Sequence, residues 1–458
     1  MPLVILGANS VSGGYEIDNS LRFNSGSSDY LNRTFSTPTN NKIWTWSCWI
    51  KRATLGQNVF FVTRTTANSY FQFTSGDKLA MVDVPVSTYN FRLQTTQVFR
   101  DVSAWYHILL SVDTTQATSS NRMKLYVNGS QITAFEFETQ PTQNFDTDIN
   151  SANLHRIGVY DGSSDFAFNG YMSDYYFIDG QALTPSSFGE TDQDTNIWKP
   201  IPYTGSFGTN GFYLEFQNSG ALGTDSSGNG NTFTVNNLTS VDQSTDTCTN
   251  NFATMNPLTS FGTVTLAEGN LQVGVPDNTA NSTSTFMVSS GKWYWEVKQT
   301  VGTLAMVGIR PEGMNYNQNS LFNLTGTNQG YYYYGDSGNI RPANTAYGNS
   351  FGVADIIGVA LDLDNNKLYF SKNGTFQNSG VPTSGATGTG AVSIATSGLT
   401  WGFSFTSGGN IDTIQCNFGS PPFTIASGNA DANGYGNFEY AVPSGYFALC
   451  TKNLAEYA

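Results

Sequence analysis

The sequence predicts an all-β protein made of two antiparallel β-sandwiches of the jelly-roll type. Two sets of segments lead to this prediction, and the first alternates apolar and polar residues with the period of two of a strand that has one buried face. The first set lies at 44–50, 105–112 and 123–129, and the second at 291–297 and 361–370. The sets differ in pattern, so we expect two separate sandwiches joined by a Gly/Ser/Asn-rich connection.

The composition supports this fold class and limits the kinds of partner. Gly is abundant (47 residues) and only 12% of residues are charged, which suits short strands and tight turns rather than long amphipathic helices. The formal net charge is −14, so a phosphate backbone would be repelled and we expect no nucleic-acid partner. No stretch approaches the roughly 20 apolar residues that span a bilayer, and we expect no membrane insertion.

Each strand of the first set carries one apolar face. The side chains that share a face are Trp44, Trp46, Cys48 and Ile50, then Tyr106, Ile108, Leu110 and Val112, then Met123, Leu125 and Val127. The last segment closes on Asn128-Gly129, which is a strong hairpin signal. These residues predict a meander of antiparallel strands.

Further phrases extend the meander in both directions. They are Leu21-Arg-Phe-Asn, Ser28-Asp-Tyr-Leu31, Arg156-Ile-Gly158 and the Gly-Tyr-Met-Ser-Asp phrase within 168–180. In order and spacing, residues 18–190 resemble the concanavalin A-like, laminin-G-type sandwich. The resemblance implies two packed sheets with a rim that frequently holds calcium in this family.

The residues that flank this sandwich lack a clear strand pattern. Residues 1–17 precede its first strand, contain no secretory signal of the usual form, and are interpreted as an N-terminal attachment arm. Residues 191–255 contain Gly, Ser and Asn clusters such as 225–231, which mark turns. They form either a linker or a final hairpin of the first domain, and we favour a partly ordered connecting segment.

The second set of strands, within 256–458, has a different signature. Gly291-Lys-Trp-Tyr-Trp-Glu-Val297 is followed by Ile357-Gly-Val-Ala-Leu-Asp-Leu-Asp364 and by Lys367-Leu-Tyr-Phe-Ser-Lys-Asn-Gly374. This combination resembles a SPRY (B30.2-type) domain. The resemblance implies a second sandwich that presents loops to a partner.

Catalysis is not predicted. Glucanases related to the concanavalin A-like fold need two carboxylates that flank the scissile bond, and the nearest acidic cluster is Glu136-Phe-Glu138, which reads better as an exposed strand edge. The chain has only two histidines, so a Ser/His/Asp triad is poorly supported. We therefore expect a non-enzymatic binding protein.

Aromatic residues beside carboxylates are the best candidates for a glycan site, because sugar rings stack on aromatic faces while carboxylates and amides bind the hydroxyl groups. The predicted ligand-binding residues are Tyr160, Asp161, Tyr331, Tyr333 and Asp336. Strand alternation would bury two tyrosines of 331–334 whatever the function. Asp161 and Asp165 could also supply oxygens to calcium, the only cofactor that we consider.

The combination of these two sandwiches with a composition rich in Gly, Asn, Ser, Thr and Tyr resembles virion proteins of tailed bacteriophages, especially marine ones. The resemblance implies a virion surface location as a tail fibre, adhesin or capsid appendage that binds host-surface glycan and other virion proteins, as a homo-oligomer. One alternative is a purely structural capsid or tail decoration protein. A glycan hydrolase is a third, less supported alternative.

Overall fold

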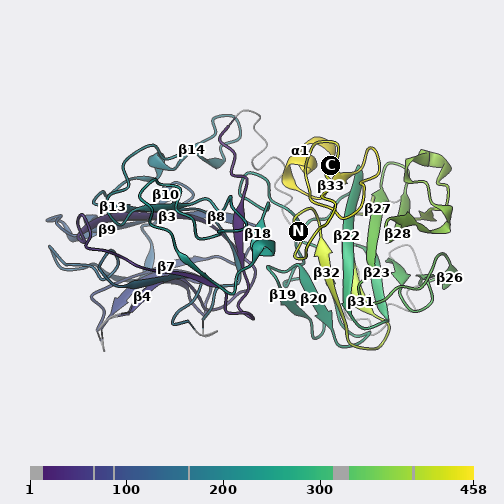
Figure 1. Cartoon of the computed structure of the whole chain (residues 1–458), viewed down its shortest axis with the longest axis horizontal. Coiled ribbons are helices and arrows are strands. Elements are labelled where there is room, and N and C mark those ends of the chain that lie inside the picture. Colours follow the sequence, from purple (N-terminus) through teal and green to yellow (C-terminus); the bar gives the residue numbers. More distant parts are fainter. Residues whose placement is uncertain (1–13, 65–67, 86–87, 163–165, 313–329, 395–397) are drawn as a thin grey trace. The chain divides into compact units, whose positions relative to one another are not determined.

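The computed structural model describes residues 14–64, 68–85, 88–162, 166–312, 330–394 and 398–458. The chain forms two compact units, and the boundary between them lies between Thr249 and Asn250. Each unit is built almost entirely from antiparallel strands (Figure 1). The predicted fold class is confirmed.

The first unit is a sandwich of two eight-stranded sheets, visible as two layers in Figure 1. Sheet I has the order β10 (Ser130–Gln131), β9 (Met123–Val127), β8 (Trp105–Asp113), β3 (Ile43–Arg52), β13 (Gly170–Asp179), β1 (Ser20–Phe23) and β18 (Gln243–Ser244), with β16 (Phe212–Leu214) paired to β13. Sheet II has the order β11 (Phe135–Thr139), β7 (Phe91–Val98), β6 (Lys78–Val84), β5 (Asn68–Phe73), β4 (Asn58–Arg64), β12 (Leu154–Ile157), β2 (Tyr30–Thr34) and β17 (Thr234–Asn236).

The core of this unit lies between the two sheets and is rich in aromatic rings. Trp44 and Trp46, which the alternation assigns to one face, are fully buried there. Trp46 packs against Phe60 and Phe71 of sheet II at ring-centroid distances of 5.5 and 5.2 Å. Such contacts add to the free energy gained by removing large apolar side chains from water.

The residues expected to form a connecting segment belong to the first unit instead. From the range 191–255, β16 pairs with β13, β17 with β2 and β18 with β1, and a separate hairpin joins β14 (Gly189–Thr191) to β15 (Trp198–Pro200). These strands are only two or three residues long, which is too short for a period of two to be recognised. Short 3₁₀ turns complete the unit: η1 (Ser119–Asn121), η2 (Pro185–Ser187) and η3 (Ser240–Asp242).

The predicted N-terminal arm is described only from residue 14 onward; residues 1–13 lie outside the described residues. The described part packs on the first unit. Ile17 is buried, and its backbone N–H donates to Oγ1 of Thr249 at 3.2 Å. Tyr15 Oη lies 3.0 Å from Tyr213 Oη. Residues 14–17 are therefore part of the folded unit, which an exposed arm would not be.

A buried ion pair ties the last residues of the first unit to the centre of sheet I. Lys51 Nζ lies 2.7 Å from Asp246 Oδ2, and both side chains are almost completely buried. The indole N–H of Trp105 donates to the other carboxylate oxygen at 3.1 Å. An ion pair that is removed from water in this way is costly to break from one side, because the remaining charge is left buried and unpaired.

Replacing Lys51 by Met should therefore lower the free energy of unfolding by about 3–5 kcal/mol. The double variant Lys51→Met/Asp246→Asn removes both charges and keeps an acceptor for Trp105, so it should recover a large part of this loss. Urea unfolding followed by tryptophan fluorescence measures both. A double variant as unstable as Lys51→Met alone would contradict this account of the pair.

The second unit is also a two-sheet sandwich (Figure 1). Sheet III has the order β19 (Thr265–Ala267), β20 (Gln272–Val275), β32 (Asp412–Asn417), β22 (Lys292–Val301), β27 (Ile356–Asp362), β28 (Lys367–Lys372) and β29 (Thr375–Phe376), with β30 (Val392–Ser393) on β28 and β33 (Phe447–Ala448) parallel to β22. Sheet IV has the order β21 (Asn281–Thr283), β31 (Trp401–Ser407), β23 (Ala305–Pro311), β24 (Tyr331–Tyr334), β25 (Asn339–Arg341) and β26 (Thr345–Ala346). Helical turns are η5 (Gln377–Ser379), η6 (Pro382–Thr387) and α1 (Thr451–Tyr457).

A buried glutamate anchors the C-terminal part of this unit to sheet III. Glu296, on β22, accepts hydrogen bonds from the backbone N–H groups of Glu439 and Tyr440, each at 2.8 Å, and from the hydroxyl of Tyr294 at 3.1 Å. Burial raises the pKa of Glu296. The Trp-Tyr-Trp-Glu-Val phrase thus supplies core aromatics on one face and this polar anchor on the other.

A buried histidine sits in the core of the first unit. His155, on β12, stacks on Phe35 with ring centroids 3.7 Å apart, and its Nδ1–H donates to the carbonyl of Asn153 at 2.9 Å. Its Nε2 has no hydrogen-bond partner. Burial lowers the pKa of His155 to about 3, so the folded state holds this ring neutral.

The unfolded chain therefore binds a proton at His155 between about pH 6.5 and 3 that the folded chain does not bind, and stability should fall as the pH is lowered through this range. His155→Phe keeps the stacked ring and cannot titrate. Its free energy of unfolding should fall less than that of the parent between pH 7 and pH 4. Equal losses in the two proteins, measured by urea unfolding at each pH, would count against this role.

Candidate functional site

The outer face of sheet I is covered by the chain itself. In segment 183–213, the rings of Phe188, Tyr203 and Phe207 pack against Tyr176 of β13. Beside them, Trp198 of β15 joins a cluster with Trp49 and Trp105. Sheet I is thus buried on both faces over these residues. The outer face of sheet II carries half-exposed polar and aromatic side chains.

His107, on β8, holds the covering segment 183–213 against sheet I through a hydrogen bond to Trp198. The indole N–H of Trp198 donates to His107 Nδ1 at 3.0 Å, so the proton of the neutral ring lies on Nε2, which donates to Ser47 Oγ at 2.8 Å. Burial lowers the pKa of His107 to about 3. A Cβ on Gly129 would lie 2.4 Å from the Trp198 ring, so only glycine allows this approach. His107 is therefore a structural residue.

The register of sheet II defines a row of side chains across its outer face. Tyr70 pairs with Val62 on one side and Val82 on the other, Val62 pairs with Arg156, and Val82 pairs with Arg92. Neighbouring residues such as Phe71 and Met81 belong to the core. Since successive side chains of a strand point to opposite faces, these five residues point outward.

Tyr160 sits on this face, as part of an aromatic and charged group. Its ring meets Tyr70 edge-on at a centroid distance of 5.5 Å and Phe166 at 6.1 Å. The Arg64 guanidinium lies over the Tyr160 ring at 4.8 Å and forms an ion pair with Asp161 at 3.4 Å. The two predicted residues of this loop, Tyr160 and Asp161, thus lie together at the edge of the row.

A second aromatic and cationic group lies toward the other edge of sheet II. The Arg92 guanidinium is 3.7 Å from the ring centroid of Phe137 and 4.9 Å from that of Tyr89. Both rings are about half exposed. Arg92 also donates to Oε1 of Gln94 at 2.8 Å. We call the outward surface formed by Tyr70, Arg156 and these two groups the sheet II face.

The calcium prediction remains a prediction. Asp165 lies outside the described residues. The carboxylate of Asp161 faces the Arg64 guanidinium, and a cation at Asp161 would have to compete with this charge. Among the described residues, no group of three or more His, Cys, Asp or Glu side chains is arranged to hold a metal ion.

Glu136 is one member of the acidic pair that was weighed as a hydrolase site, and it lies on the exposed strand β11. It faces Lys78 Nζ at 2.9 Å and accepts a hydrogen bond from Gln94. The Lys78 contact lowers the pKa of Glu136, whereas a general acid of a glycosidase needs a raised pKa. Glu136 is therefore suited to an ion pair and not to proton donation.

The three predicted residues of the second unit have different environments. Tyr333 is fully buried, stacks on Phe370 at 5.4 Å and donates its hydroxyl to the carbonyl of Asn349, so it is a core residue and not a surface ligand. Tyr331 is half-buried beside Trp401. Asp336 is exposed in the turn after β24. Three of the four tyrosines of 331–334 are buried, because both faces of β24 are covered.

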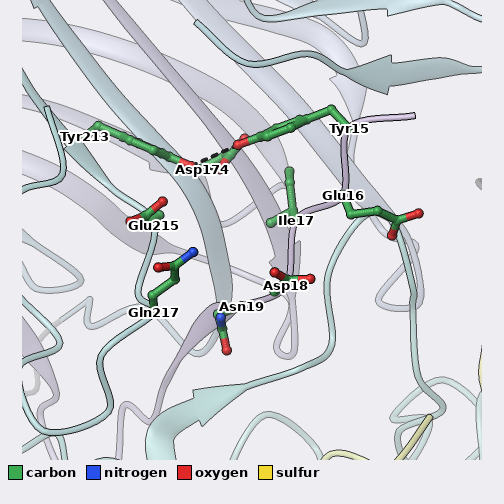
Figure 2. A pocket seen from close by; sticks show the side chains of 9 residues that line it. All are labelled: Tyr15, Glu16, Ile17, Asp18, Asn19, Asp174, Tyr213, Glu215 and Gln217. Carbon is green, nitrogen blue, oxygen red and sulfur yellow. Dashed lines mark hydrogen bonds between the residues drawn. The ribbon is translucent and has the colours of Figure 1, made fainter. Parts of the chain in front are cut away.

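A small cavity of about 90 Å³ lies at the opposite side of the sandwich, on sheet I. Figure 2 shows Tyr15 and Tyr213 with their hydroxyl groups meeting at Asp174. Tyr213 donates to Asp174 Oδ1 at 2.6 Å. Asp174 has a φ of +46° at an irregularity in the pairing of β13 with β3, as expected of a bulge that redirects one side chain. The full lining is Tyr15, Glu16, Ile17, Asp18, Asn19, Asp174, Tyr213, Glu215 and Gln217.

Burial, assisted by the charge of Glu215, raises the pKa of Asp174 to about 7. No sequence pattern marks this group, because Asp174 occurs inside a largely apolar strand and its partners come from distant segments. The roles of Tyr70, Arg64 and Arg92 are not evident from the sequence either. The alternation of Tyr70 and Gln72 with Phe71 and Phe73 is the one signal that could have placed an aromatic residue on the outer face.

Two family models match the chain. The model described as the concanavalin A-like lectin/glucanases superfamily matches residues 25–187, and the SPRY domain model matches residues 292–407. The chain thus combines a lectin-like sandwich with a sandwich of a protein-interaction type. In particular, it contains a laminin-G-type domain followed by a SPRY domain, which confirms both predicted domain types. No curated protein matches the sequence significantly.

Three solved structures show limited similarity. The SPRY domain of human HERC1 is 13% identical, with 35% of this chain and 96% of that chain covered and a TM-score of 0.28. A provisionally assigned carbohydrate-binding protein from Bacteroides ovatus is 16% identical, with 48% and 59% covered and a TM-score of 0.36. The heptameric SAP-like pentraxin of Limulus polyphemus is 18% identical, with 37% and 80% covered and a TM-score of 0.28. No helix among the described residues is long and apolar enough to cross a membrane.

Asp174 should give the first unit a distinctive pH dependence. Between about pH 4 and 7 the folded chain holds a proton at Asp174 that the unfolded chain has released, so this group lowers stability as the pH rises. Asp174→Asn cannot ionise and keeps an acceptor for Tyr213. Its free energy of unfolding should therefore decline less than that of the parent from pH 5 to pH 8. The same decline in both proteins would show that Asp174 does not titrate in this range.

Proposed function

We propose that the chain is a non-enzymatic glycan-binding protein and that the sheet II face of its first unit is the binding surface. The observation that carries the proposal is the group of Tyr160, Tyr70 and Arg64 beside Asp161 on an outward-facing sheet. Half-exposed rings offer platforms for the apolar faces of sugars, and neighbouring guanidinium and carboxylate groups bind hydroxyl groups. The match to a lectin-like family model supports the same class of ligand.

The setting that we propose is the surface of a bacteriophage virion, as a tail fibre, adhesin or capsid appendage that recognises host-surface glycan. The support is the order of the two sandwich types and the Gly-, Asn- and Tyr-rich composition. In this setting, other virion proteins and further copies of the chain are its protein partners. Immunogold labelling of purified particles with an antibody to the chain tests the location.

A structural decoration protein is the second candidate, and one observation in the second unit favours it. Val301, Val353 and Ile411 are large aliphatic side chains that are about half exposed or more. Val301 and Ile411 lie near each other, because a Cβ added at Gly302, which follows Val301, would lie 2.5 Å from the carbonyl oxygen of Ile411. Val353 lies in the same region, because the backbone N–H of the next residue, Ala354, donates to the carbonyl of Gln299 on β22. Clustered apolar residues on a surface favour a protein partner.

Tyr160→Ala and Tyr331→Ala form a matched pair for testing the glycan proposal, since each removes one half-buried tyrosine, one from each unit. A glycan array first identifies a ligand for the parent chain. Tyr160→Ala should then weaken binding about 10-fold, or about 1.4 kcal/mol, because a stacking platform is lost. Tyr331→Ala should bind like the parent.

Melting temperatures of both variants, measured by circular dichroism, control for loss of the fold. A parent chain that binds no glycan, or a Tyr331→Ala variant that alone loses binding, would overturn the assignment to the sheet II face. Binding repeated with calcium and then with chelator also tests the calcium prediction, since loss with chelator would show that a metal takes part.

A further inference from the structure

The charges on the sheet II face differ from those of the chain as a whole. The chain has a formal net charge of −14, with 20 Lys and Arg against 34 Asp and Glu. Four cationic side chains nevertheless lie on this one face: Arg64, Lys78, Arg92 and Arg156. Arg64 is paired with Asp161 at 3.4 Å, and Lys78 with Glu136 at 2.9 Å. The other two cations have no ion pair among the described residues.

The two cations without ion pairs lie in one row. Arg156 and Arg92 are joined through the register by Val62, Tyr70 and Val82. They are four strand spacings apart, which corresponds to about 19 Å between their backbones. The half-buried ring of Tyr70 lies midway between them. The row therefore presents a cation at each end and an aromatic platform at the centre.

The environment of Arg92 suits it to a planar anion. The rings of Tyr89 and Phe137 hold the guanidinium by cation–π contacts. Among the described residues, only Gln94 Oε1 accepts a hydrogen bond from the Arg92 guanidinium. Its other N–H groups are therefore available to a ligand. A guanidinium of this kind matches the two oxygens of a carboxylate and also binds sulfate oxygens.

Arg156 is half-buried on β12 and makes no hydrogen bond or ion pair within the described residues. The side chain is partly covered, and its guanidinium N–H donors have no protein acceptor among the described residues, so they are available to a ligand. A bound anion would supply the acceptor. The same argument does not apply to Arg100, whose ion pair with Asp77 at 2.9 Å satisfies its charge.

We infer that the sheet II face selects an anionic glycan, with a carboxylate or sulfate group bound at Arg92 and another at Arg156 and a sugar ring against Tyr70. This inference rests on the proposed function and names the class of glycan. A neutral glycan offers these two guanidinium groups only hydroxyl and ring oxygens, which are weaker acceptors than the oxygens of a carboxylate or sulfate. The net charge of −14 of the whole chain disfavours long polyanions such as nucleic acids, which would extend beyond the face.

The test compares probes that differ only in charge. Binding of the full chain to polygalacturonate and to its fully methyl-esterified form is measured by isothermal titration calorimetry, and dextran sulfate against dextran repeats the comparison for sulfate. At least one charged probe should bind about 10-fold more tightly than its neutral partner, and high salt should weaken it. The pair that shows the difference identifies carboxylate or sulfate as the recognised group.

Three variants test which arginines bind the charged group. Arg92→Gln and Arg156→Gln should each weaken binding of the charged probe about 10-fold and leave the melting temperature unchanged. Arg100→Gln removes the same charge from the same unit at a paired site, and it should bind the charged probe like the parent.

Equal binding of charged and neutral probes would overturn the inference and leave the proposed function intact. Absence of binding to every glycan, charged or neutral, would remove the proposed function and the inference with it. Equal loss in all three variants, or equally tight binding of single-stranded DNA, would show a general anion-binding surface and would also overturn the inference.

Discussion

The cover over sheet I is the constraint on which the proposed site depends. Trp198 reaches the outer face of this sheet and donates to His107, which in turn donates to Ser47. These hydrogen bonds hold segment 183–213 against the sandwich. Burial of His107 away from water lowers its pKa and keeps the ring neutral. Sheet I is buried on both faces over much of its area, whereas sheet II carries half-exposed aromatic and cationic residues such as Tyr70 and Arg156 on its outer face.

Charge placement then gives that surface its chemical character. The chain is strongly acidic, and the buried cations Arg22, Lys51 and Arg52 form ion pairs with Asp242, Asp246 and Asp77. Arg92 and Arg156 are different, because neither forms an ion pair with a carboxylate of the described residues, although the charge of Arg92 helps to lower the pKa of Glu136. Rings on the same face, including Tyr70 and Tyr160, supply apolar area without adding charge. A surface with these two components suits a ligand that is both ring-shaped and polar.

The sequence was sufficient for the fold class and the two domain types, because these depend on local alternation and on phrases such as Trp44–Ile50 and Lys292–Val301. It was insufficient for β16 to β18, whose two or three residues are too few to show a period. It misassigned Tyr333, since alternation predicts which residues share a face but not that both faces of β24 are covered. The row from Arg156 to Arg92 depends on register between strands far apart in sequence, which no local pattern encodes.

Hydrogen–deuterium exchange of the full chain, with and without a glycan that binds it, tests the central claim most directly. The account predicts slower exchange in peptides that cover 58–73, 89–98 and 154–162, which carry most of the sheet II face, and unchanged exchange in the peptides of the second unit. Protection confined to the second unit, or to residues 14–19 beside the cavity at Asp174, would contradict it.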